Sequence, residues 1–151
     1  MLRTLAEIEN LAALLLSKAG YCGVAASDCA FLESVGYPGL KILAEALVDP
    51  RREIVLEKDN LGLDLQNFSC VFLAESVDAL IVEHGRLFLR NVRHGLYLLP
   101  GSVRRNYGIG CPVDPAFALG GERSKNPYAE KLEVAARQGV EVDDAQWLAL
   151  Q

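Results

Sequence analysis

The chain has little of what metal sites and redox motifs require. It contains two histidines, and none of its four cysteines belongs to a C-x-x-C pair. The usual zinc spacings are therefore missing, and we expect no metal, no cofactor and mostly buried, reduced thiols. P-loop, nucleophile-elbow and zinc motifs are missing as well. The sequence thus predicts no catalytic residue and leaves open whether the protein is an enzyme.

Long apolar runs and an excess of basic residues are also missing. The longest apolar run, Leu11–Leu16, is far shorter than the roughly 20 residues of a membrane-spanning helix. Glu7 and Glu9 interrupt the stretch where a secretory signal would have its apolar core. A net charge of −5 argues against bulk binding to nucleic acid. We therefore expect a cytoplasmic protein that binds neither membranes nor nucleic acids.

What the chain does have is apolar surface to bury. Its 151 residues are 51% hydrophobic, which is high for a soluble chain and predicts a tightly buried core or an oligomer interface. The length favours a single domain, residues 1–151, with a core of its own.

The first third of the chain reads as helical. Thr4 and Glu7 have the spacing of a capping box, and the helix that follows is apolar on most sides, up to a stop at Gly20. A second helix is expected over about Val24–Val35. A third is expected from Pro38, which suits a first helical turn, to the Asp49-Pro50 pair.

The middle of the chain reads as sheet-rich. The apolar run Ser69–Ala74 predicts a buried strand, followed by a short helix from Ser76 to Glu83 that ends at Gly85. Leu87–Val92 and Leu96–Leu99 predict a β-hairpin. Pro100-Gly101 then predicts a turn, and the glycine- and proline-rich residues 107–121 a loop.

The last part of the chain is again predicted to be helical. Asn126 is expected to cap a helix that has Leu132, Ala135 and Ala136 inside and that ends at Gly139. A last short helix begins at Asp143 or Asp144. This order predicts an α+β protein, in which an N-terminal helical unit (1–49) packs on a small mixed β-sheet (within 50–125), with C-terminal helices (126–151).

The most uneven charge lies in residues 85–113. This segment has five arginines and no acid, so the rest of the chain carries a net charge of −10. Arginine binds carboxylate or phosphate through paired hydrogen bonds, which makes the segment a candidate site for an anionic metabolite. The alternative is that these arginines form ion pairs with the surplus acids of the chain. The candidate ligand-binding residues are Arg86, Arg90, Arg93, His94, Arg104, Arg105 and Cys111.

Cys111 enters this set for two reasons. It closes the glycine-containing stretch Tyr107–Cys111, whose backbone N–H groups could bind an anion. With His94 as a base it would also have the residue types of a nucleophilic pair. The alternatives are an ordinary turn-rich loop and a buried, inert thiol.

Several short stretches are similar to a bacterial family catalogued as domain of unknown function 3726. Leu5–Ala12 with Lys18–Tyr21 resembles its opening helix and glycine turn. Phe68–Ala74 with Arg90–His94 resembles its central strand and arginine-bearing segment, and Asp144–Leu150 its late tryptophan helix. The resemblance implies no activity. The opening helix is also similar to that of the type-2 malate/lactate dehydrogenases, but their catalytic histidine region has no counterpart here.

Two functional hypotheses follow. The first is a non-catalytic interaction protein or accessory subunit that acts as an oligomer. It rests on the high apolar content, and a monomer at high concentration with no exposed apolar patch would count against it. The second is a binding protein or enzyme with an arginine-lined site for a carboxylate or phosphate metabolite. The partners expected in these two cases are a second copy of the chain and an anionic small molecule.

Overall fold

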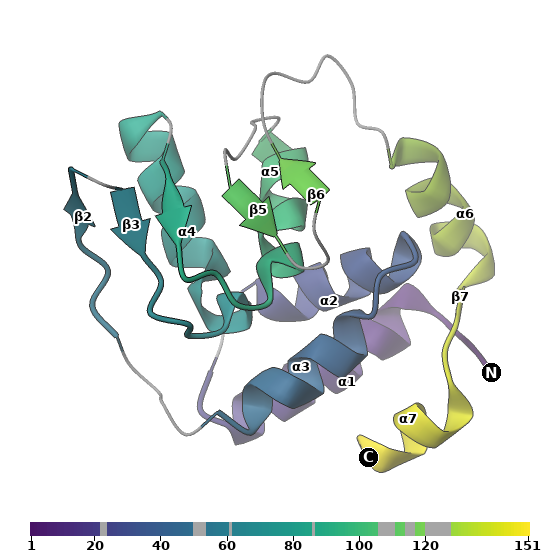
Figure 1. Ribbon diagram of the computed structural model, residues 1–151. Coiled ribbons are helices and arrows are strands. Elements are labelled where there is room, and N and C mark those ends of the chain that lie inside the picture. Colours follow the sequence, from purple (N-terminus) through teal and green to yellow (C-terminus); the bar gives the residue numbers. More distant parts are fainter. Residues whose placement is uncertain are drawn as a thin grey trace. The chain divides into compact units, whose positions relative to one another are not determined.

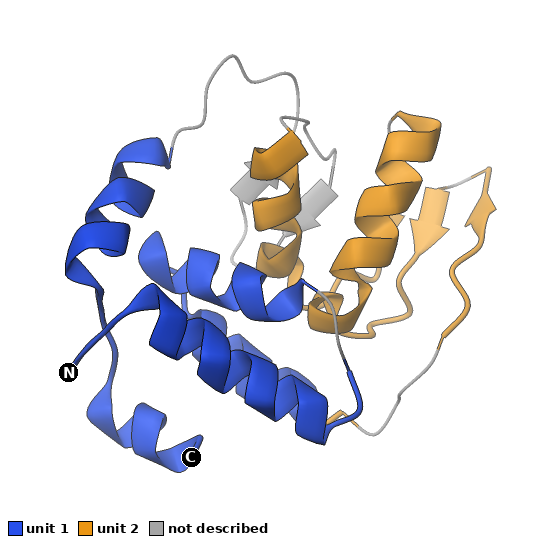
Figure 2. Ribbon diagram, turned by 180° about the vertical axis from the view of Figure 1, so that it is seen from behind, with its two compact units in different colours: residues 1–48, 127–151 blue, residues 49–126 orange. Residues whose placement is uncertain are grey.

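The computed structural model describes residues 1–21, 24–49, 54–60, 62–85, 87–105, 111–113, 117–119 and 128–151 (Figure 1). It divides into two compact units (Figure 2). Unit 1 contains Met1–Val48 and Pro127–Gln151, and unit 2 contains Asp49–Asn126. Helices outweigh short strands throughout, so the predicted α+β class is confirmed. Whether the two units form the single domain predicted from the length stays a prediction.

Helix α1 of unit 1 spans Leu5–Lys18 and begins as the sequence predicts. Thr4 Oγ1 accepts the N–H of Glu7 at 3.1 Å, and Glu7 Oε2 accepts the N–H of Thr4 at 2.8 Å, which completes the capping box. The helix is not buried on most sides, however, because Leu14 is 52% exposed. Its buried face is a single stripe of Ile8, Leu11, Ala12 and Leu16.

Helices α2 (Ala25–Ser34) and α3 (Gly39–Leu47) confirm the two further predicted helices. Gly36 adopts a φ of +91° in the turn between them, where other residues would be strained. Gly39 lies so close to α2 that a Cβ atom there would come within 2.7 Å of the Cys29 carbonyl oxygen. The two helices bury Leu32, Leu40 and Leu43 completely.

The C-terminal elements of unit 1 are α6 (Ala129–Gln138), β7 (Val140–Glu141) and α7 (Asp144–Ala149). Strand β7 pairs antiparallel with β1 (Leu2–Arg3), so the two ends of the chain share one small sheet. Asp143 caps α7 by accepting the N–H of Gln146 at 2.8 Å, as expected. The predicted cap of α6, Asn126, lies outside the described residues.

Only part of the predicted inner face of α6 is buried. Ala135 is buried and Leu132 is half-buried, but Ala136 is exposed, so that part of the prediction is wrong. Near its start, α6 faces α2: the rings of Phe31 and Tyr128 meet edge to face, with centroids 6.0 Å apart. Most of α6 therefore lies at the surface of unit 1.

Unit 2 contains the small mixed sheet that the sequence predicts. Its order is β2 (Lys58–Asp59), β3 (Gly62–Asp64) and β4 (Leu89–Arg90), with β2 antiparallel and β4 parallel to β3. Parallel neighbours need a crossover connection, which here contains α4 (Cys70–His84). The chain continues through the 3₁₀ helix η1 (Gly95–Leu98) and α5 (Leu99–Arg105) to the antiparallel pair β5 (Cys111–Val113) and β6 (Phe117–Leu119).

The strand predicted over Ser69–Ala74 is wrong, because these residues begin α4. Ser69 caps this helix through its Oγ atom, which accepts the N–H of Val71 at 3.1 Å. Ser76, the predicted cap, lies inside the helix, whereas the predicted end at Gly85 is confirmed. A short apolar run cannot be told from a buried helical turn by its pattern alone, and the cap decides here.

The predicted hairpin is also wrong. Residues 96–99 are helical, Pro100 and Gly101 belong to α5, and the first strand is reduced to β4. Strand β4 pairs with β3 instead, while Asn91 and His94 take φ values of +53° and +59° and redirect the chain. Residues 111–113 and 117–119 form strands inside the segment predicted as a loop. At β4 a partner from much earlier in the chain overrides the local turn signal, whereas β5 and β6 pair with each other.

Candidate functional site

The arginines of residues 85–113 meet acids of unit 2. Arg90 Nη2 lies 3.2 Å from Asp59 Oδ2, which joins the two outer strands of the mixed sheet. Arg105 Nε donates to Asp78 Oδ2 at 2.7 Å, and this pair joins α5 to α4. These are the ion pairs that the alternative interpretation of the segment expects.

The third pair is more buried. Arg93 Nη1 lies 3.2 Å from Asp49 Oδ2, and the Asp49 side chain is only 4% exposed, whereas that of Arg93 is 42% exposed. The carbonyl oxygen of Arg93 also accepts the N–H of Cys70 at 2.9 Å, at the start of α4. Arg93 thus has a structural role, because it places a positive charge beside a carboxylate that water does not reach.

The other members of the predicted set are placed as follows. Arg104 is exposed at the end of α5. Arg86 and the side chain of Cys111 lie outside the described residues, so the proposed pairing of Cys111 with His94 cannot be placed. The three described ion pairs each use a different carboxylate on a different element. An anion site at these arginines stays a prediction.

His94 is held by a residue that the sequence analysis did not include in the site. Its Nδ1 atom lies 2.7 Å from Ser69 Oγ, and both residues are buried. Ser69 is also the cap of α4, and His94 begins η1 in a left-handed conformation. A serine beside a histidine has the residue types of a nucleophile and its base, but Ser69 is fully buried, so a substrate cannot reach it. The pair joins two elements of unit 2.

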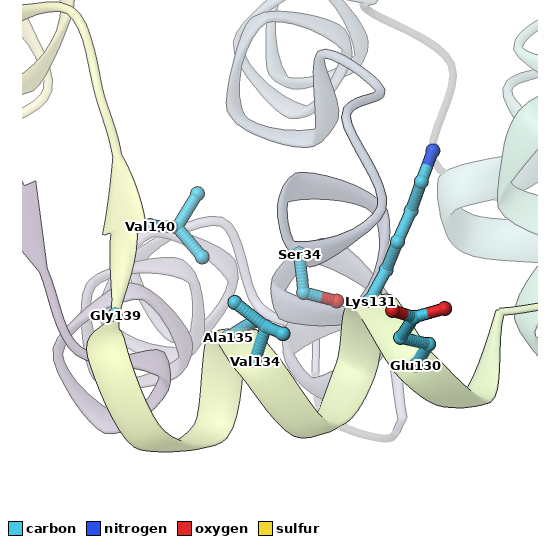
Figure 3. Close-up of a pocket in the computed structure, with 7 residues that line it drawn as sticks. All are labelled: Ser34, Glu130, Lys131, Val134, Ala135, Gly139 and Val140. Carbon is cyan, nitrogen blue, oxygen red and sulfur yellow. The ribbon is translucent and has the colours of Figure 1, made fainter.

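Unit 1 has an open groove beside α6. One cavity, of about 430 Å³, lies between the end of α2, α6 and β7 (Figure 3). A second, of about 500 Å³, continues past the turn between α2 and α3. Both have Ser34, Lys131 and Val140 in their walls, so we treat them as one, the α6 groove. Its lining residues are Glu33, Ser34, Val35, Gly36, Tyr37, Pro38, Glu130, Lys131, Val134, Ala135, Gly139, Val140, Glu141 and Gln146.

The groove combines an apolar part with charged groups. Val134, Ala135 and Val140 lie together at the end of α6 that leads into β7, and Glu130 and Lys131 lie toward its start (Figure 3). The Ser34 hydroxyl on α2 donates to the carbonyl oxygen of Phe31. Such a mixture of apolar surface and a few polar groups is typical of binding sites, and its volume is in their usual range.

Glu33 is the most buried acid in the groove. Its Oε1 atom accepts the N–H of Leu40 at 2.9 Å, in the first turn of α3. Burial raises the pKa of Glu33 above its ordinary value, and the hydrogen bond from Leu40 offsets only part of this effect. The groove therefore presents a carboxylate that is incompletely compensated, which favours a cationic group nearby.

The α6 groove is not among the sites predicted from the sequence. Its residues come from three stretches separated by up to a hundred positions, and no motif links them. One signal was present in retrospect: Val134 occupies the polar side of α6, where it is 37% exposed. Single exposed apolar side chains are common on protein surfaces, so this signal alone does not indicate a binding site.

Other kinds of site find no support among the described residues. There, no group of three histidine, cysteine, aspartate or glutamate side chains is arranged to hold a metal ion. Cys29 and Cys70 are buried and are present as thiols. Within the same residues, none of the helices combines the length and apolar character needed to cross a membrane.

Comparison with protein-family models, with curated proteins and with solved structures finds no match to this chain. The resemblance to the domain of unknown function 3726 therefore stays a prediction.

Proposed function

We propose that this protein is a non-catalytic interaction protein that binds its partner in the α6 groove. The observation that carries the proposal is the groove itself, an elongated and open depression with apolar side chains beside charged ones. Protein interfaces combine such an apolar centre with a polar rim. The ion pairs of unit 2 add support, because three of the five arginines that would recognise an anionic metabolite already face carboxylates.

Self-association is part of the proposal. Unit 1 exposes several large apolar side chains outside its core, among them Leu2 at 59%, Leu14 at 52% and Leu148 at 67%. Exposed apolar surface of this kind is suited to burial between copies. Sedimentation velocity over a wide range of concentrations tests this part. A mass that stays that of one chain throughout would contradict it.

The groove is tested by selecting binders from a random peptide library with the whole protein. Selected peptides should bind the wild type but not Val134→Lys, because this change places a long charged side chain in the apolar part of the groove. Ala136→Lys is the matched control, since Ala136 is exposed on the same helix and does not line the groove. Peptides that bind both variants equally well, or a selection that yields none, would refute the proposal.

A further inference from the structure

One edge of strand β7, which lies at the margin of the α6 groove, is not used for pairing with β1. Met1 and Val142 form a hydrogen-bonded pair: the N–H of Val142 donates to the Met1 carbonyl oxygen at 2.9 Å, and the Met1 amine donates to the Val142 carbonyl oxygen at 2.8 Å. The next pair, Leu2 with Glu141, is then a non-hydrogen-bonded pair. Its backbone groups point away from the partner strand, so the N–H and C=O of Glu141 face the outer edge of β7.

This edge borders the groove. Val140 lines both cavities and Glu141 lines the second one. Within the part of the chain that the structure describes, β7 pairs with β1 alone. An unpaired strand edge beside an apolar depression is the arrangement used in strand addition, where backbone hydrogen bonds provide affinity and the neighbouring pockets take alternate side chains.

The charge of the groove favours some extended peptide segments over others. Among the described residues, its walls contain the carboxylates of Glu33, Glu130 and Glu141 against the single ammonium of Lys131. The Met1 amine, 3.3 Å from Glu141 Oε2, compensates one of these carboxylates. An excess of negative charge remains, and Glu33 contributes to it from a half-buried position. Arginine or lysine side chains complement such a surface, whereas acidic ones are repelled.

We propose that the α6 groove receives an extended peptide segment with alternating apolar and basic side chains, which adds as a strand to the outer edge of β7 through Glu141. This inference rests on the proposed function and specifies the partner. The apolar side chains contact Val134 and Val140, the basic ones face the carboxylates, and the backbone pairs with the N–H and C=O of Glu141.

The test uses a short fluorescent peptide of alternating leucine and arginine and measures its binding to the whole protein by anisotropy. We expect saturable binding. The same peptide, N-methylated on the amides along one edge, should bind at least about tenfold more weakly, because it cannot form the strand hydrogen bonds. A peptide of alternating leucine and glutamate should not bind.

A pair of variants tests the strand edge from the side of the protein. Glu141→Pro removes the outward N–H but none of the hydrogen bonds to β1, and proline is tolerated on an edge strand. It should weaken the peptide at least about tenfold, whereas Glu141→Ala, which keeps the N–H, should weaken it only a few-fold. If Glu141→Pro does not fold, the N-methylated peptide still decides the question on the wild type.

The outcomes separate this inference from the proposed function. Equal binding of the N-methylated and unmodified peptides overturns strand addition, and equal binding of the acidic peptide overturns the preference for basic side chains. If either result comes with loss of binding in Val134→Lys but not in Ala136→Lys, the groove remains a binding site. No binding of the leucine–arginine peptide to the wild type overturns the inference as a whole.

Discussion

The arginine segment (residues 85–113) of unit 2 and the α6 groove of unit 1 differ in how well their neighbours compensate the carboxylates. In unit 2, donors compensate the acids: the pKa of Asp64 is lowered, mainly because the Asn91 side chain donates a hydrogen bond to it. In the groove, burial raises the pKa of Glu33. The contrast teaches that a charged segment conspicuous in the sequence can serve the fold. A carboxylate that is less well compensated marks the better candidate for binding.

Arg93→Ala should have the largest effect, because Arg93 is the cation beside the buried Asp49 carboxylate. Removing one partner of a buried pair costs several kcal/mol, and since Arg93 is itself partly exposed we expect about 2 kcal/mol of lost stability. Urea unfolding measures this loss. Asp49→Asn in the same chain should recover part of it, because a neutral amide then replaces the buried carboxylate that has lost Arg93. No recovery would show that the pair is not the cause.

Arg90→Ala sharpens the comparison within the same segment. Both side chains of the pair with Asp59 are partly exposed, at 32% and 58%, so its removal should cost only about 0.5 kcal/mol in the same urea experiment. The effect should shrink further at high salt, which screens exposed charges but not buried ones. A loss as large as that of Arg93→Ala would mean that burial does not distinguish the two pairs.

The pattern of residues predicted the helices of unit 1 well. The capping box of Thr4 and the glycine after α6 are local signals, and each acts where the sequence places it. Ser69–Ala74 was misread because an apolar run shows burial without showing geometry. The hairpin failed because the partner of β4 is β3, more than twenty residues earlier in the chain.

The candidate sites could be predicted only in part. The arginines were found because they are adjacent in sequence, but their partners Asp49, Asp59 and Asp78 are not, so ion pairs could not be told from a ligand site. The groove could not be found at all. Its walls join only when the strand pairing of β1 with β7 and the packing of α6 on α2 bring distant stretches together.

Glu33→Gln tests whether the Glu33 carboxylate in the groove makes the stability of the protein depend on pH. The raised pKa means that the fold disfavours the ionised form of the Glu33 carboxylate. Below the ordinary pKa of 4.5 the group is protonated and does not destabilise the fold. The free energy of unfolding then falls as the pH rises through the raised pKa. Glutamine keeps an acceptor for the Leu40 N–H without the charge. Thermal unfolding should therefore show the variant gaining on the wild type with increasing pH. A constant difference at every pH would contradict the assignment.

The smallest effect is expected from anions. Because three arginines of the segment already face carboxylates, phosphate and small carboxylic acids should leave the melting temperature unchanged. A specific ligand at a hundred times its Kd would instead add about 2.7 kcal/mol of stability. A rise that disappears in Arg90→Ala or Arg93→Ala would restore the anion site predicted from the sequence. A rise that persists in both variants would place the anion elsewhere, and the contrast between paired arginines and an open groove would still hold.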